Sequence, residues 1–493
     1  MARNIWATKS IEQLKQDAEA GHGDGHGGGV TLKRTLGPWN LVALGIGAII
    51  GAGLFSLTGI AAANNAGPAV TLSFVLAAVG CAFAGLCYAE FASMIPIAGS
   101  AYAYSYATMG ELMAWIIGWD LVLEYAVGAA TVGISWSGYF VSLLHGWGIN
   151  LPPEFIASPW QPVKLPSGEL VHGIINLPAA LIVLIVSYIL SRGTEESAFL
   201  NSIMVILKVA VVLVFIAIGY SFINPVNYTP YIPESTGVFG EFGYSGILRG
   251  AAVVFFAFIG FDAVSTAAQE AKNPQRDMPI GIIGSLVICT ILYVLFSHVM
   301  TGMVNYTEFK GVAAPVALAI DKTGIAWLLP TIKIAILAGY TSVILVMLLG
   351  QSRVFFSMSK DGLISKFFSD THPKYHTPAK SNMFFGVIVA GFAAFAPISL
   401  VGEVTSMGTL LAFILVCAGI IIMRKKAPDM PRAFKTPLVP LVPILGILFC
   451  SAMMLSLLTD WSHVARLFGW LAVGMIIYFT YSVKHSRLQK SVQ

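Results

Sequence analysis

The stretch "LGIGAIIGAGLF", Leu44 to Phe55, decides the fold because it places four glycines inside an apolar segment that is long enough to cross a membrane. Gly47 and Gly51 have the G-x-x-x-G spacing, which is typical of close packing between two membrane helices. Each glycine also weakens a helix by about 1 kcal/mol relative to alanine. The stretch is therefore either a packing face or a place where the helix is interrupted.

The composition indicates an all-α integral membrane protein. Of the 493 residues, 57% are hydrophobic and only 11% are charged, whereas soluble domains carry about 25% charged residues. The five cysteines all fall within apolar segments, which argues against a disulfide framework and against a metal cluster. We predict neither a bound metal nor an organic cofactor.

The apolar segments also predict the topology. A bilayer requires about 20 apolar residues per helix, and such windows predict twelve transmembrane helices. They lie at about residues 39–63, 68–91, 111–144, 174–191, 199–222, 246–268, 280–302, 326–355, 382–397, 401–423, 438–458 and 465–483. With the N-terminus inside, 21 Lys and Arg side chains lie on inner segments and five lie on outer segments. This bias predicts that both termini are cytoplasmic. Residues 1–35, which contain the Gly-rich run "GHGDGHGGG", are predicted to be a disordered cytoplasmic N-terminus, and residues 484–493 a cytoplasmic tail.

Ionisable residues inside the predicted helices are candidates for function, because burying a charge in a membrane is costly. Lys208 lies in the fifth helix, in "NSIMVILKVAVVLVFI", about 13 Å from its start at 1.5 Å per residue. It is either a structural lysine bonded to carbonyl groups or a proton-carrying amine. Asp120 and Glu124 share one face of the third helix, Asp120 being the nearer to the cytoplasmic end, and Asp262 follows Gly260 in the sixth helix.

The sixth helix contains a second Gly-interrupted polar stretch, "AFIGFD", from Ala257 to Asp262. Transporters built from two inverted repeats often have discontinuous helices at matching positions, here the first and the sixth. Unwound backbone is tolerated in a membrane only where it faces a cavity or a ligand. Its N–H groups attract a carboxylate and its carbonyl groups attract an ammonium group, so a zwitterion suits both. We therefore predict non-helical torsions between Ile49 and Gly53, and again near Ile259 and Gly260, in a transporter of a small zwitterionic or charged solute.

Several longer stretches resemble the cationic amino acid transporter family of the amino acid–polyamine–organocation (APC) superfamily, and a bacterial member in particular. They include "GIGAIIGAGLF", "FFAFIGFDAVSTAAQEAKNPQRDMPIGI", "GQSRVFFSMSKDG" and "MRKKAPDMPRAFKTPLVPLVPILG". The resemblance runs from about Leu36 to Tyr481. It implies the LeuT fold, in which two inverted five-helix repeats (residues 36–222 and 242–425) are followed by helices 11 and 12 (residues 436–483).

The resemblance also implies residue roles. The backbone N–H groups of Gly51, Ala52 and Gly53 are expected to bind the substrate α-carboxylate. The α-ammonium group is expected at the carbonyl of Ile49 and at carbonyls of the sixth helix around three residues: Phe256, Ala257 and Ile259. Phe256 matches an aromatic lid. Met347 matches a position in the side-chain pocket, although plain packing is an equal interpretation. Lys208 matches a lysine of proton-coupled relatives, with Glu124 and Asp262 as further candidates for proton coupling.

Taken together, these features predict a secondary active transporter of L-amino acids in the bacterial inner membrane, working by proton symport and alternating access. The expected substrates are small neutral or cationic amino acids. We expect a monomer, with a small single-span accessory subunit as a further candidate partner. An exchanger without net proton coupling and a non-transporting amino acid sensor are the alternatives. The sequence contains neither H-E-x-x-H nor G-x-S-x-G, so no enzyme is expected.

Two further residue positions carry structural expectations. Gly45 and Gly47 are interpreted as packing positions against the fifth helix near Lys208. Glu90, at the end of the second helix, is assigned to the membrane interface.

Overall fold

The computed structural model describes residues 4–10, 12–14, 36–95, 100–160, 162–164, 168–193, 198–268, 271–375 and 377–491. Most of the predicted N-terminal region, residues 15–35, lies outside them. Within the described residues the chain is helical apart from one antiparallel pair of short strands, β1 (Val163–Lys164) and β2 (Leu170–Val171). The prediction of a helical membrane protein is confirmed at this level.

The first part of the chain, up to residue 222, contains the helices α2 (Pro38–Ile49), α3 (Thr58–Ala61), α4 (Val70–Met94), α5 (Ser100–Thr108), α6 (Glu111–Val122), α7 (Gly128–Gly146), α8 (Leu177–Ser191) and α9 (Ala198–Gly219). Proline in the first turn of α2 and α8 is compatible with a helix start, where no backbone N–H is needed. At α8, the side chain of Asn176 also accepts the N–H of Ala179, at 3.2 Å.

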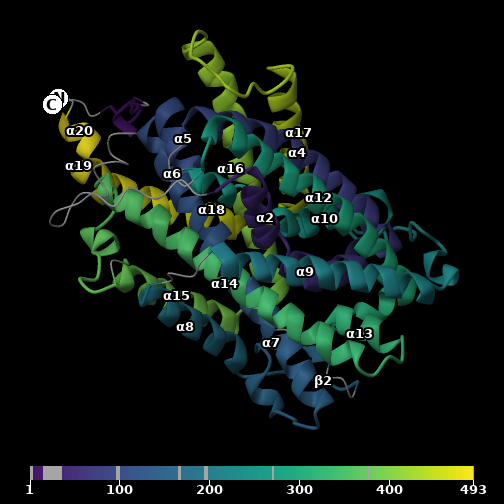
Figure 1. Cartoon of the computed structure of the whole chain (residues 1–493). Coiled ribbons are helices and arrows are strands. Elements are labelled where there is room, and N and C mark those ends of the chain that lie inside the picture. The colour runs from purple at the N-terminus through teal and green to yellow at the C-terminus, as the bar shows by residue number, and fades with distance from the viewer. Residues whose placement is uncertain are drawn as a thin grey trace.

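The second part contains α10 (Gly243–Val254), α11 (Ala263–Thr266), α12 (Pro274–Met303), α13 (Pro315–Asp321), α14 (Leu328–Lys360), α15 (Ala379–Phe395), α16 (Ile398–Lys426), α17 (Leu441–Leu457), α18 (Trp461–Ile477), α19 (Val483–His485) and α20 (Arg487–Ser491). In the described part of the chain, eight helical segments are long and apolar enough to cross a membrane, and α2, α8, α15 and α17 are shorter apolar helices. The long helices run between an end that carries α19 and α20 and an opposite end that carries α13 and β2 (Figure 1).

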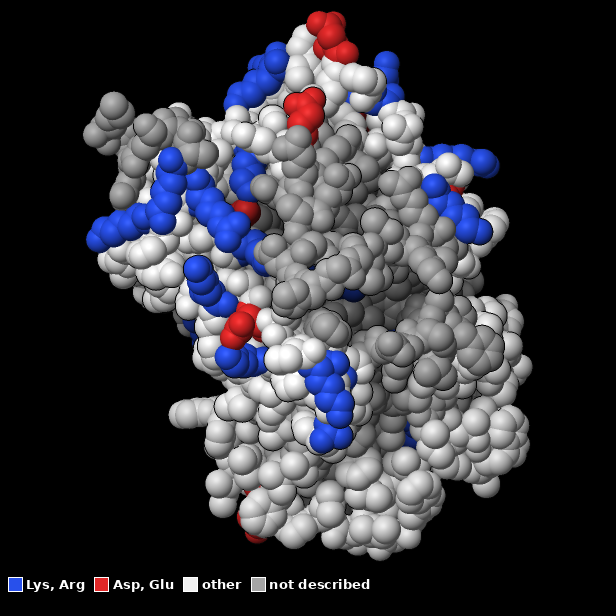
Figure 2. All heavy atoms as spheres, turned by 60° about the vertical axis from the view of Figure 1, so that its left-hand side comes forward, with Lys and Arg blue, Asp and Glu red and all other residues white. Residues whose placement is uncertain are grey.

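The N-terminal and C-terminal segments meet on one face of the molecule. Gln489 Nε2 donates to the carbonyl oxygen of Asn4 at 2.7 Å, and Lys9 Nζ lies 2.5 Å from Asp361 Oδ1 at the end of α14. Figure 2 looks onto the side that carries α19 and α20, where Lys and Arg side chains outnumber acidic ones. The two ends of the described chain thus lie on the same side of the helical body.

One of the structural expectations is wrong. A Cβ atom on Gly45 would overlap the side chain of Ser285, so this glycine allows α2 to approach α12, the seventh predicted helix, and not the fifth. Glu90, which is assigned to the membrane interface and lies near the end of α4, is fully buried within the protein. Its carboxylate accepts from Arg424 Nε and Nη2, both at 2.9 Å, and lies 3.1 Å from Arg432 Nε. Neither partner can be read from the local sequence pattern around the glycine or the glutamate.

Candidate functional site

The first predicted helix is interrupted after Ile49. Ile50 has the extended torsions φ −72° and ψ 105°, and helical structure resumes as a π-helical turn, Gly53–Leu57. The N–H groups of Leu54 and Phe55 both approach the carbonyl oxygen of Gly51 at 3.2 Å. The N–H groups before them, at Gly51, Ala52 and Gly53, open the second half of the helix, where no preceding turn supplies an acceptor. This end of the half-helix carries the positive end of its dipole.

The sixth predicted helix is interrupted in the same way. After α10 the chain tightens into a 3₁₀ turn, Phe255–Phe258. Ile259 then turns to ψ 131° and Gly260 to φ +120°, a conformation that glycine adopts without steric cost. The torsions therefore leave the helical region at both places where the sequence predicted it.

The two interruptions touch each other. A Cβ atom on Gly53 would overlap the backbone of Ala257, and one on Gly260 would stand 2.9 Å from the carbonyl carbon of Ala48. Glycine is required at both positions because two backbones approach each other without side chains between them. The structure thus brings the predicted binding residues Gly53 and Ala257 together, with Ile49, Gly51, Ala52, Phe256 and Ile259 on the same two segments.

Tyr293 of α12 links the two interruptions and was missed by sequence reasoning. Its hydroxyl lies 2.9 Å from the carbonyl oxygen of Ile49 and 2.9 Å from that of Ala257. A tyrosine hydroxyl has one proton to donate, so only one carbonyl receives it at a time. The local sequence "TILYVLFSH" contains no signal for this role, because the two acceptors lie 244 and 36 residues away along the chain.

Lys208 of α9 is buried next to the first interruption. Its side chain is 2% exposed, and Nζ donates to the carbonyl oxygen of Gly47 at 2.5 Å. A Cβ atom on Gly339 of α14 would stand 3.2 Å from Lys208 Cε, so the stem of the lysine fills the space beside this glycine. Among the described residues, no carboxylate lies within ion-pair distance of Lys208. The ammonium group is therefore held by the carbonyl end of α2, as a cation at a helix C-terminus is.

The predicted acidic residues form a separate buried group. Asp262 accepts the hydroxyl of Tyr125 at 2.8 Å and the N–H of Gly260 at 3.2 Å, so its carboxylate belongs to the second interruption. Glu124 lies beside Asp262 and Thr409, yet neither of its oxygens makes a well-aligned hydrogen bond within the described structure. The oxygens of Asp120 also lack partners there. Buried polar atoms of this kind call for water or a ligand, because leaving them unpaired is costly.

Met347 of α14 is buried against the third predicted helix. A Cβ atom on Gly128 would stand 3.2 Å from Met347 Sδ, so the thioether occupies the space that the glycine leaves. Met347 thus packs against the third predicted helix.

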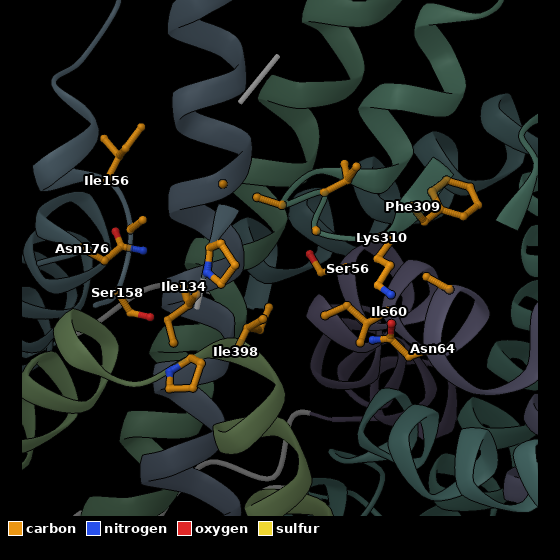
Figure 3. A pocket seen from close by; sticks show the side chains of 18 of the residues that line it. Ser56, Ile60, Asn64, Ile134, Ile156, Ser158, Asn176, Phe309, Lys310 and Ile398 are labelled. Atoms are coloured by element: carbon orange, nitrogen blue, oxygen red, sulfur yellow. The ribbon is translucent and has the colours of Figure 1, made fainter. Parts of the chain in front are cut away.

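A cavity opens beside the second half of the first interrupted helix (Figure 3). Ser56, Ile60, Asn64 and Lys310 line it on one side, and Asn176 and Ser158 lie across it (Figure 3). None of the predicted binding residues is among its lining residues. The cavity thus reaches the π-helical turn of the interrupted helix but not the glycines of the break.

Comparison with known proteins assigns the family. The family model described as amino acid permease matches residues 36–480. The chain is an amino acid permease of the APC superfamily. The permease is 48% identical to the branched-chain amino acid permease BcaP of Bacillus subtilis (strain 168) over 490 residues, covering 99% of this chain and 100% of the relative.

Two further relatives show the breadth of the family. The permease is 43% identical to the methylthioribose transporter of Bacillus subtilis (strain 168) over 462 residues, which cover 93% of this chain and 96% of the relative. It is 37% identical to the vacuolar cationic amino acid transporter 4 of Arabidopsis thaliana over 399 residues, which cover 81% of this chain and 64% of the relative. The permease is thus a multi-pass bacterial membrane transport protein, and its relatives are named as permeases or transporters, not as enzymes.

Proposed function

We propose that the permease carries L-amino acids into the bacterial cell by proton symport and alternating access. The substrate carboxylate binds the N–H groups of Gly51, Ala52 and Gly53. The ammonium group binds the carbonyl oxygens of Ile49 and Ala257, where it competes with the hydroxyl of Tyr293. Phe256 and Ile259 complete the wall contributed by the sixth helix, and Met347 borders the side-chain pocket. The touching interruptions support this arrangement because they place unwound backbone of both signs side by side.

The substrate class follows from the apolar pocket wall and from the relatives. A buried methionine next to Gly128 favours an apolar side chain, and two of the relatives described above are named for branched-chain amino acids and for methylthioribose. We therefore propose small and branched neutral amino acids as substrates, with cationic amino acids as the second class, in which Glu124 and Asp262 face the substrate cation.

The same proposal includes twelve membrane-spanning helices in the LeuT arrangement, with both termini cytoplasmic. The packing supports two repeats, because helices five positions apart in the predicted order contact each other: α4 with α12, α7 with α14, and α8 with α15. The contact between Gln489 and Asn4 supports an even number of crossings. The excess of Lys and Arg on this face supports the cytoplasmic side. The protein is proposed to work as a monomer, with a single-span subunit as an optional partner.

The observation that carries proton coupling is the isolated ammonium group of Lys208 on the carbonyl of Gly47. An amine at this point can gain and lose its charge. When it is protonated, it stabilises the carbonyl end of α2, and when it is neutral, it releases that end. Glu124 and Asp262 are the acidic groups proposed to exchange the proton. In an exchanger, Lys208 would remain charged throughout the cycle.

Uptake into proteoliposomes tests the function and the coupling together. The wild-type protein is expected to accumulate radiolabelled alanine or leucine when an inward proton gradient is imposed. Lys208→Ala is expected to abolish accumulation while keeping counterflow. Lys333→Ala is the matched control, because Lys333 is also a buried lysine but donates to the carbonyl of Ser142 instead of to an interrupted helix. Accumulation by Lys208→Ala at the wild-type level would contradict the coupling, and binding without any flux would favour the sensor.

A further inference from the structure

A polar cluster joins four helices at the end of the molecule opposite the two termini. It consists of Arg249 on α10, Glu403 on α16, His463 in the first turn of α18, and the last carbonyl groups of α17. Arg249 donates to the carbonyl oxygen of Ser456, and its Nη2 lies 3.5 Å from Glu403 Oε1. His463 is 9% exposed and Glu403 is 17% exposed. The cluster is therefore largely shielded from solvent.

The imidazole of His463 lies between two acceptors. Nδ1 is 3.0 Å from the carbonyl oxygen of Leu457 and Nε2 is 3.0 Å from Glu403 Oε2. A carbonyl oxygen only accepts hydrogen bonds, so Nδ1 carries a proton. In a neutral imidazole, Nε2 then has a lone pair, and a lone pair facing a carboxylate oxygen at 3.0 Å is repulsive. The contact requires one further proton, on Nε2 or on the carboxyl group.

The other charged groups around the imidazole favour a proton at this point. The C-terminal carbonyls of α17 stabilise a cation. Asp460, three residues before His463, contributes a negative charge, and Arg466 on the same helix contributes a positive one. The backbone N–H and the side chain of Ser462 hold the pKa of Asp460 below its usual range, so Asp460 is ionised at neutral pH. Arg249 faces the opposite oxygen of Glu403.

The cluster lies next to the segment that follows the first interruption. Glu403 and Arg249 line a cavity together with Leu57, Ile60 and Asn64. A Cβ atom on Gly402, the neighbour of Glu403, would stand 3.4 Å from Leu57 Cδ1. A change in the position of α16 at this point is therefore transmitted directly to the second half of the interrupted helix.

We propose that His463 and Glu403 share one titratable proton and form a pH-sensitive latch that holds this face of the permease closed. With the proton bound, α18 and α17 are tied to α16 and α10, and the cavity beside Leu57 keeps the narrow form described above. When the proton leaves, the imidazole and the carboxylate repel each other, and α16 is free to move away from the interrupted helix. Histidine is suited to this role because its charge ordinarily changes between about pH 5 and pH 8. As regulation of the transport cycle, the latch rests on the proposed function, and the proposed orientation places it outside the cell.

Cysteine accessibility tests the latch without any substrate or transport. Ser399 lines the same cavity, and each native cysteine is buried, so Ser399→Cys provides a selective site for a maleimide. Labelling is measured at about pH 6 and about pH 8, on either side of the usual titration of histidine. The variants His463→Gln and His463→Ala are measured in the same background. The proteins are compared with one another at the same pH, because ionisation of the shared thiol then affects each labelling rate equally.

The amide N–H of glutamine donates a hydrogen bond to Glu403 at every pH, and alanine donates none. The two variants therefore give the closed and the open limits. The Ser399→Cys protein that keeps His463 is expected to have the labelling rate of the glutamine variant at the lower pH and that of the alanine variant at the higher pH. The two limits are expected to differ by about tenfold, the effect of one hydrogen bond to a charged group. His145→Gln, an exposed histidine at the end of α7, is expected to keep this response.

The proposal would be overturned if the ratio of the two labelling rates, with His463 present and with His463→Ala, were the same at both pH values. Loss of the response in His145→Gln would do the same, because it would assign the effect to another histidine. Size-exclusion chromatography establishes that each variant is folded. If labelling depends on pH as expected but the protein shows no amino acid uptake, only the transport proposal is refuted. If the protein takes up amino acids but labelling does not depend on pH, only the latch proposal is refuted.

Discussion

The backbone of Gly53 lies against the backbone of Ala257, so closely that a single Cβ atom on the glycine would overlap the alanine. The two residues belong to different interrupted helices and are 204 positions apart in the chain. Their contact is the point at which the first and the sixth predicted helices meet.

Gly53→Ala is expected to push these two segments apart. Overpacking of a filled core typically costs about 1–3 kcal/mol, and here the displaced atoms are backbone rather than a flexible side chain. We expect a lower unfolding temperature in detergent and a loss of the stabilisation that an amino acid substrate confers. Gly391→Ala is the control, because a Cβ atom there has no neighbour within 4 Å. An equal effect of both substitutions would show that the close approach has no special role.

Tyr293→Phe is expected to remove the donor shared by the carbonyls of Ile49 and Ala257. Leaving a buried acceptor unpaired costs about 1–3 kcal/mol, so the substrate-free permease should unfold at a lower temperature. A substrate ammonium group can bind the same carbonyls, so the increase in unfolding temperature caused by substrate should be larger than in wild type. Tyr228→Phe, at a hydroxyl that donates to the carbonyl of His298, controls for the loss of any tyrosine hydroxyl. A smaller substrate effect in Tyr293→Phe than in wild type would contradict the shared carbonyls.

Glu124→Gln is expected to separate stability from proton-driven transport. Both oxygens of Glu124 are buried near Asp262 without a well-aligned hydrogen bond, so removal of the ionisable group should leave the unfolding temperature unchanged or higher. If Glu124 exchanges the proton, accumulation driven by a pH gradient should fall to near background while counterflow persists. Glu154→Gln, on the exposed surface, should change neither. Full gradient-driven accumulation by Glu124→Gln would remove this residue from the proton path.

Glu90→Gln is expected to be among the most destabilising single charge removals in the permease. Removing one partner of a buried ion pair costs about 3–5 kcal/mol, and Glu90 faces both Arg424 and Arg432. Glu308→Gln, which breaks the exposed pair with Lys322, should cost no more than about 1 kcal/mol. Thermal unfolding of the purified proteins compares the two. Equal unfolding temperatures would mean that water or the free arginines compensate for the lost carboxylate.

The interruptions of the first and sixth helices could be predicted because glycine and polar residues within apolar helices leave a mark in the sequence itself. The depth of Lys208 could be predicted for the same reason, since it depends only on the position in the helix. The partners of these residues could not. These partners are fixed by the way distant helices pack: Tyr293 between the two interruptions, Ser285 against Gly45, and Arg424 with Glu90. The apolar segments that carry them have no periodicity strong enough to show which side faces which neighbour.

The hydrogen bond between Gln489 and Asn4 joins residues that are 485 positions apart, and this separation has a consequence for biosynthesis. A ribosome adds about 5–20 residues per second, so Asn4 leaves the ribosome well before its partner exists. During that interval the N-terminal segment has no C-terminal segment to bind. The contact on this face therefore forms only after Gln489 has left the ribosome, and a nascent permease remains open there to chaperones and proteases until then.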